Sequence, residues 1–113
     1  MMDIENTNIQ KLHKLHHILN TTVDLLPIEN SLIAFEIILE TMSYHYRDDE
    51  LSLKVIFSSK KFTEMGARFH LNRLVKNEWI ISEKSIHDLR VKTIRPTEKL
   101  IKIFDQFLKT SFN

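Results

Sequence analysis

The 113-residue sequence contains a single glycine, two prolines and no cysteine. Without cysteine it can form no disulfide, no thiol nucleophile and no cysteine-based zinc site. Phosphate-binding motifs of the GxGxxG and GxxxxGKS/T types need several glycines, because backbone amides must approach the phosphates closely, and one glycine cannot build either. The motifs GxSxG and HExxH are missing as well. We therefore expect a protein that is not an enzyme and that carries no cofactor.

Long apolar segments are also missing. No run of about 18 apolar residues occurs, as a membrane-spanning helix would need, and the acidic, polar start MMDIENTN is unlike a secretory signal. The length fits one domain that can bury a core without staples. With 42% apolar and 27% charged residues, the composition is that of a soluble globular protein. The sequence predicts a single cytoplasmic domain, residues 1–113, with no membrane partner.

Positive charge is scarce in the first half of the chain and abundant in the second. Residues 1–50 carry three basic and nine acidic side chains, a net charge of −6. Residues 51–113 carry thirteen basic and six acidic ones, a net charge of +7. Such asymmetry indicates an anionic partner for the second half, and nucleic acid is the commonest partner of this kind.

Apolar residues at steps of three and four predict an amphipathic helix over residues 8–26, which Pro27 ends. Its apolar stripe comprises Ile9, Leu12, Leu15, Leu19, Val23 and Leu26. Ser31 can cap a second helix that ends near residues 47–50. We expect the buried face of this second helix to contain Leu32, Phe35, Ile38, Leu39 and Met42.

Two further helical patterns follow, separated by a break of about four residues at 58–61. Ser52 can cap the first, and Thr63 can cap the second, which runs to about Lys76. A short helix, a tight break and a helix with the small Ala67 at its first inward turn match the geometry of a helix-turn-helix. Asn77 is expected to stop the second helix in the left-handed conformation.

After this helix the period of the sequence changes. The segments WIISEK and RVKTIR are rich in β-branched residues and are joined by the polar tip SIHDL, which predicts a two-stranded hairpin. Pro96 ends the second strand, and Thr97 can cap a last helix over about residues 97–110. The predicted fold class is mainly α with a small β-hairpin wing. Its winged helix-turn-helix core, at about residues 51–96, is flanked by N- and C-terminal helices.

The stretch from about residue 51 to residue 100 resembles the MarR (multiple antibiotic resistance regulator) family of bacterial transcription factors. RLVKNEWI, residues 73–80, is similar to the end of the family's recognition helix, except that Glu78 replaces the usual glycine. DLRVKTIRPTEKL, residues 88–100, is similar to the family's wing and the helix after it, with departures at Pro96 and Leu100. The resemblance implies a nucleoid-associated bacterial protein that binds double-stranded DNA and regulates transcription.

Candidate DNA contacts gather in the predicted recognition helix and wing. Arg68 and Asn72 lie one turn apart on the outer face, and such side chains bond bidentately to guanine and adenine; a solvated surface pair is the alternative. The resemblance implies that Asp88 orients Arg90 toward a minor groove or a phosphate; a local surface ion pair is the alternative. Further contacts are expected from Lys60, Lys61, Thr63, Glu64, Met65, Gly66, Arg73, Lys84, Lys92 and Arg95.

Gly66, the only glycine, lies in the first turn of this helix, where glycine costs about 1 kcal/mol relative to alanine. A missing side chain there would let the helix backbone approach DNA closely. It would equally let the helix pack tightly against its partner helix. The sequence favours neither interpretation.

Histidines raise the question of a metal site. His13, His16 and His17 have a spacing that can seat zinc, but no carboxylate lies within a turn of them and Lys14 adds a cation. We therefore predict no metal site, and we expect His70 to be a hydrogen-bonded core histidine. A small-molecule effector stays an open alternative for which the sequence supplies no convincing pocket residues.

The two terminal helices carry more apolar surface than a small winged core needs, and such surface must be buried somewhere. We therefore predict a homodimer through Leu12, Leu15, Leu19, Ile101, Phe104, Phe107 and Leu108. The favoured function is that of a sequence-specific DNA-binding transcriptional regulator acting as a homodimer. The alternative is a winged-helix module that binds another protein and not DNA. Acidic or apolar residues on the outer face of the recognition helix would mark that alternative.

Overall fold

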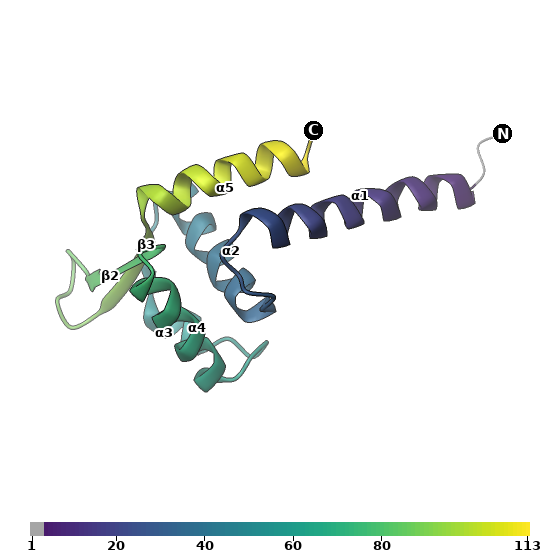
Figure 1. Ribbon diagram of the computed structural model, residues 1–113. Coiled ribbons are helices and arrows are strands. Elements are labelled where there is room, and N and C mark those ends of the chain that lie inside the picture. Colours follow the sequence, from purple (N-terminus) through teal and green to yellow (C-terminus); the bar gives the residue numbers. More distant parts are fainter. Residues whose placement is uncertain (1–3) are drawn as a thin grey trace.

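The computed structural model describes residues 4–113, which form five helices and three short strands (Figure 1). Helices α1 (Ile4–Leu25) and α2 (Leu32–Tyr46) precede strand β1 (Leu51–Ser52), α3 (Leu53–Phe57) and α4 (Glu64–Lys76). Strands β2 (Ile80–Lys84) and β3 (Lys92–Pro96) form the wing, and α5 (Glu98–Ser111) follows. The predicted fold class, a winged helix-turn-helix between two terminal helices, is confirmed.

The helix starts are determined by local sequence. The side-chain oxygens of Ser31, Thr63 and Thr97 each accept a hydrogen bond from the backbone amide three residues further on. Within the described chain, Ser52 stands at the cap position of α3 but makes no such bond. Each cap bond contributes about 1 kcal/mol. The predicted starts of α2, α4 and α5 are therefore confirmed together with their cause.

The core gathers around α2, which packs against α4 and β3. The prediction for its buried face was wrong at two positions, because Leu32 is 73% exposed and Leu39 is 36% exposed. The buried residues of α2 are Ala34, Ile37, Ile38, Thr41 and Met42. Since nearly every residue from 32 to 39 is apolar, the period alone could not orient this helix, and the true face is turned by about one residue.

The wing is part of a three-stranded antiparallel sheet with the order β1-β3-β2, whereas the sequence predicted two strands. The additional strand pairs Leu51 with Ile94 and Ser52 with Thr93. Two residues are too few to show an alternating pattern, so the sequence carries no signal for β1. Leu51 is 1% exposed, and this strand therefore fixes the base of the wing to the core.

The end of α4 corrects a second prediction. Asn77 keeps an ordinary backbone conformation with φ of −87°, and Glu78 takes the left-handed one with φ of 64°. The amides of Glu78 and Trp79 donate to the carbonyls of Val75 and Leu74, which is the hydrogen-bond pattern of a Schellman cap. Glutamate thus stands at the position where such caps favour glycine.

Helices α1 and α5 run side by side, and the N-terminal part of α1 extends past the body of the molecule (Figure 1). The molecule is correspondingly elongated, with principal extents of 61, 28 and 24 Å. Lys14 Nζ donates to the carbonyl of Ser111, and His17 Nε2 donates to the carbonyl of Thr110 at 2.6 Å. Within the described residues, no helix combines the length and the apolar character needed to cross a membrane.

Candidate nucleic-acid interface

The outer face of α4 is free of the core. Ala67, Leu71 and Leu74 form its buried side. Residues at steps of four, three and four lie on the opposite side, because each residue turns the helix by about 100°. These are Met65, Phe69, Asn72 and Lys76, and all four are exposed. The helix therefore presents one continuous ridge that begins at its N-terminal turn.

Arg68 lies beside this ridge and is engaged within the chain. Its Nη2 donates to Glu64 Oε1 at 2.8 Å, and its guanidinium carbon lies 4.1 Å from the centre of the Phe57 ring on α3. Both charged side chains stay more than half exposed, so the pair adds little stability. Two of the predicted DNA contacts thus form one mutually neutralised pair at the flank of the helix.

The environment of Gly66 separates the two interpretations of this residue. A Cβ placed on Gly66 would lie 2.8 Å from Ile33 Cδ1 on α2 and 3.1 Å from Thr63 Oγ1. Since carbon atoms do not approach to 2.8 Å, Ile33 would have to move. Gly66 therefore lies in close contact with α2, which supports the packing interpretation, although the atom that would move is the flexible end of the Ile33 side chain.

Arg73 was predicted to contact a phosphate, and the structure contradicts this. Its side chain is only 14% exposed and turns toward the α1–α2 turn. There Nη1 donates to the carbonyl of Pro27 at 3.3 Å, and Nε lies 3.5 Å from Glu29 Oε2. Glu29 and Asn30 in this turn have left-handed backbone, with φ of 48° and 62°. The sequence could not reveal this role because the partners are more than forty residues away.

His70 reinforces the same contact between α4 and α2. Its Nε2 lies 3.2 Å from Ser31 Oγ, as expected for a hydrogen-bonded core histidine, while Nδ1 has no partner among the described residues. Burial lowers the pKa of His70, and the neighbouring Arg73 lowers it further, against a smaller opposite effect of Glu29. The ring is therefore held in its neutral form at neutral pH.

The exposed lysines divide into paired and unpaired ones. Lys61 Nζ donates to Glu36 Oε1 at 3.0 Å, and on the wing Arg95 Nε donates to Glu83 Oε1 at 2.7 Å. The exposed lysines that form no ion pair within residues 4–113 include Lys60, Lys76, Lys84 and Lys92. They lie just before α4, at its end, and on the two wing strands.

At the wing tip, Asp88 holds Arg90 in two places. Asp88 Oδ1 accepts from the backbone amide of Arg90 at 3.0 Å and from its Nε at 3.1 Å, and Oδ2 accepts from Nη2 at 3.2 Å. These bonds, the side-chain one first, lower the pKa of Asp88 below its ordinary value. The Arg90 side chain is nevertheless 91% exposed. The wing therefore presents an ordered guanidinium to the solvent.

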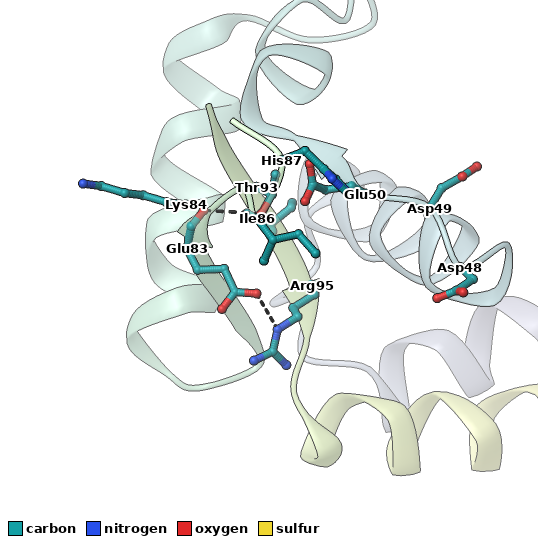
Figure 2. A pocket seen from close by; sticks show the side chains of 10 residues that line it. Asp48, Asp49, Glu50, Glu83, Lys84, Ile86, His87, Thr93 and Arg95 are labelled. Atoms are coloured by element: carbon teal, nitrogen blue, oxygen red, sulfur yellow. Dashed lines mark hydrogen bonds and ion pairs between the residues drawn. The ribbon is translucent and has the colours of Figure 1, made fainter. Parts of the chain in front are cut away.

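The base of the wing is tied to the segment that follows α2. Ser85, which is 2% exposed, donates its hydroxyl to Glu50 Oε1 at 2.6 Å and accepts the amides of His87 and Asp88. Beside this bond lies an open hollow of about 450 Å³. Figure 2 shows its walls, with Asp48, Asp49 and Glu50 across from the wing strands that carry the Glu83–Arg95 pair. The hollow is lined by charged groups of both signs. The Ser85–Glu50 hydrogen bond beside it helps to orient the wing.

Sequence reasoning missed several residues of this surface. Phe69 and Lys76 were not recognised, although their spacing of four and eleven residues from Met65 places them on the same ridge. Ser85 was missed because nothing local shows that its partner is Glu50. The one local sign, a serine whose hydroxyl can accept hydrogen bonds from the backbone amides that follow it, occurs in many turns.

The predicted dimer residues fall into two groups. Leu12, Leu15 and Leu19 on α1 are 52%, 63% and 56% exposed. Phe104 and Phe107 on α5 are each 4% exposed and belong to the core of the chain itself, while Ile101 and Leu108 are partly buried against it. The prediction is therefore wrong for the direct contact of Phe104 and Phe107 with a second copy, because neither ring reaches the surface.

Solved structures share this fold over nearly the whole chain. A transcriptional regulator from Thermotoga maritima is 10% identical with a TM-score of 0.69, covering 96% of this chain and 74% of its own. MepR from S. aureus, in a mutant form bound to an oligodeoxyribonucleotide, is 16% identical with a TM-score of 0.69, at 95% and 76% coverage. A mutant of MarR from E. coli complexed with operator DNA is 15% identical with a TM-score of 0.61, at 98% and 80% coverage.

No family model and no curated protein matches the sequence. At identities this low, the similarity is a similarity of fold. The resemblance to MarR-type winged-helix regulators, drawn from residues 51–100, is confirmed at this level, and it extends to the helices on both sides of the winged core.

Proposed function

We propose that this chain is a member of the MarR family that binds specific sequences of double-stranded DNA as a homodimer and regulates transcription in the cytoplasm. The observation that carries the proposal is the combination of a free ridge on α4 with an ordered, 91% exposed Arg90 on the wing. In helix-turn-helix proteins the corresponding helix lies in the major groove. A wing arginine then suits the adjacent minor groove or backbone, where the negative potential attracts cations.

The distribution of charge supports this proposal. Unpaired lysines at positions 60, 76, 84 and 92 lie before α4, at its end and along the wing, so they border the ridge on several sides. Lysines of this kind neutralise phosphates without reading sequence. In the sequence the acidic residues are concentrated in residues 1–50 and the basic ones in residues 51–113. MepR and MarR, which share the fold, have been solved with DNA.

The exposed stripe of α1 supports the homodimer. Ile9, Leu12, Leu15, Leu19 and Val23 are each between 46% and 63% exposed. A row of this length at steps of three and four would bury well against a second copy of itself. A twofold dimer would set two α4 helices about 34 Å apart, the spacing of successive major grooves. It would therefore bind a pseudo-palindromic site.

One observation favours a second candidate function. Met65 is 82% exposed and Phe69 is 60% exposed, and apolar residues on this face are the expected mark of a module that binds another protein. The loss of Arg73 from the surface points in the same direction. The unpaired lysines and the exposed Arg90 favour DNA as the partner, because an apolar protein groove would gain little from these positive charges.

Selection of bound sequences from a random duplex pool separates the two candidates. DNA binding predicts enrichment of one pseudo-palindromic sequence, with an affinity that falls linearly with the logarithm of salt concentration. A pool that remains random after repeated rounds contradicts the proposal and favours the protein-binding module.

The wing provides a sharper test on the selected sequence. Arg90→Ala should weaken binding by about 1–3 kcal/mol, the range for a good arginine contact. The matched control is Arg47→Ala, because Arg47 also pairs with an aspartate two positions away, Asp49 at 3.7 Å, and precedes the winged core in the sequence. Equal affinities of the two variants would remove the wing from the mechanism.

A further inference from the structure

The ridge of α4 begins with two apolar side chains in succession. Met65 and Phe69 stand one turn apart, and they are among the most exposed large apolar residues of the helix at 82% and 60%. They lie opposite the buried Ala67, Leu71 and Leu74, so the core does not use them. Phe69 has one aromatic neighbour in the described structure, His70, at 5.0 Å between ring centres. Both side chains are thus directed at whatever lies against this helix.

The polar residues of the helix restrict what that surface can recognise. Arg68, the residue suited to guanine, is held by Glu64 at 2.8 Å and stacked on Phe57. Arg73 is turned into the α1–α2 turn. Asn72 and Lys76 remain on the ridge itself, behind Phe69. From the N-terminal turn onward, the ridge therefore consists of two apolar side chains, one amide and one ammonium group.

Among the base edges in the major groove, thymine alone presents an apolar group, its C5-methyl. Asparagine matches adenine, the partner base of thymine, through N6 and N7. Resting on the proposed function, we propose that Met65 and Phe69 contact thymine methyl groups, and that this chain reads consecutive A·T pairs in each half-site. The unpaired Lys60 and Lys76 at the two ends of α4 give this apolar ridge the positive border that a duplex requires.

Replacement of thymine by deoxyuridine tests this directly, because it removes the methyl group and leaves every hydrogen-bonding atom in place. The probe is the duplex enriched from the random pool, with each thymine replaced in turn. For the wild-type chain, replacement at one or two positions per half-site should weaken binding about fourfold each, the effect of one buried methyl group. Replacement elsewhere should change nothing.

Two variants complete the experiment. Phe69→Ala should bind the thymine duplex at least tenfold more weakly and should lose the discrimination between thymine and uracil at the affected position. Phe69→Leu, which keeps an apolar side chain, should retain part of it. The control Lys76→Ala should weaken binding to both duplexes equally, because it removes only a phosphate contact. Circular dichroism should confirm folding, which is expected since the substituted side chains are exposed.

The outcomes are distinct. Equal affinity of the wild-type chain for the thymine and the uracil duplex overturns this inference and leaves DNA binding standing. Discrimination that persists unchanged in Phe69→Ala and in Met65→Ala overturns it as well. Failure of the pool to enrich any duplex overturns the proposed function and this inference together.

Discussion

Helices α1 and α5 have similar amphipathic sequences, but the apolar face of α5 is buried within the chain and that of α1 is exposed. Both show apolar residues at steps of three and four, and both were predicted to supply one dimer surface. In the structure the rings of Phe104 and Phe107 on α5 are 4% exposed, whereas Leu15 and Leu19 on α1 are 63% and 56% exposed. The apolar period of a helix predicts that one face will be buried. It does not tell whether that face is buried by the chain itself or by another molecule.

The difference arises from what lies beneath each helix. α5 follows β3 directly and lies over α2, where Phe107 stands 6.4 Å from Phe35 and Phe104 stands 6.4 Å from Tyr46, each measured between ring centres. α1 precedes α2 through a turn that points it away from the winged core (Figure 1). Lys14 and His17 of α1 bond to the carbonyls of Ser111 and Thr110 at the end of α5. The apolar stripe of α1 is left facing outward.

The largest expected effect is on α5. Phe104→Ala should reduce the free energy of unfolding by about 3–5 kcal/mol, because it opens a cavity in the core. Its control is Phe112→Ala on the same terminus, which is 65% exposed and should change the free energy by less than about 0.5 kcal/mol. Urea titrations measure both. Similar losses in the two variants would mean that α5 is not the buried helix.

On α1, the double variant Leu15→Glu/Leu19→Glu should act on assembly. If the exposed stripe is the dimer surface, each leucine contributes about 1.5–3 kcal/mol there, so dissociation should become easier by roughly 100-fold or more. Sedimentation across a concentration series measures this, and circular dichroism should show the helices retained. The control His13→Glu/Asn20→Glu adds the same charges at exposed positions outside the stripe. A wild-type chain that stays monomeric at micromolar concentration contradicts the prediction.

A smaller effect, of opposite sign, is expected near the end of α5. Ser111 is fully buried, and its hydroxyl has no hydrogen-bond partner among residues 4–113. Ser111→Ala removes this unsatisfied group and should raise the free energy of unfolding by about 1 kcal/mol. Thermal and urea unfolding measure the change. A loss of stability would indicate that the hydroxyl is bonded in solution.

The smallest effect concerns Tyr46, which packs on α5. Burial raises the pKa of Tyr46 above 10.0, and the charge of Asp105 adds to the shift. The unfolded tyrosine therefore loses its proton first, and the stability of the fold should fall as pH rises from about 10 through the raised value. Asp105→Asn should lower this pKa part of the way. Absorbance titration in a Tyr44→Phe background follows Tyr46 alone, and an unchanged titration would exclude the effect of Asp105.

The local features of the fold could be predicted from the sequence. Caps such as Ser31, Thr63 and Thr97 bond within three residues, so the information lies beside them. Features that depend on distant partners could not. Arg73 resembles a phosphate contact until the carbonyl of Pro27 is seen beside it, and Gly66 has no assigned role until Ile33 is placed above it.

The candidate site shows the same division. Helical spacing places Met65, Phe69 and Asn72 on one ridge, and the Asp88–Arg90 pair is short enough in sequence to be foreseen. The neutralisation of Arg68 depends on the approach of α3, which brings Phe57 under its guanidinium. The sequence thus predicted which side chains of the helix are exposed. It could not predict which of them are engaged by other parts of the chain and which are free to bind a partner.

The turn between α1 and α2 has a mechanical consequence. Arg73 and His70 on α4 bond to Pro27 and Ser31, which lie on either side of this turn. The direction of α1 and the position of α4 therefore depend on the same turn, which acts as a joint between them. With 22 residues, α1 is a lever about 33 Å long, and a tilt of about 5° at the joint displaces its far end by about 3 Å. Because Lys14 and His17 also bond α1 to the end of α5, such a tilt would have to carry the end of α5 with it.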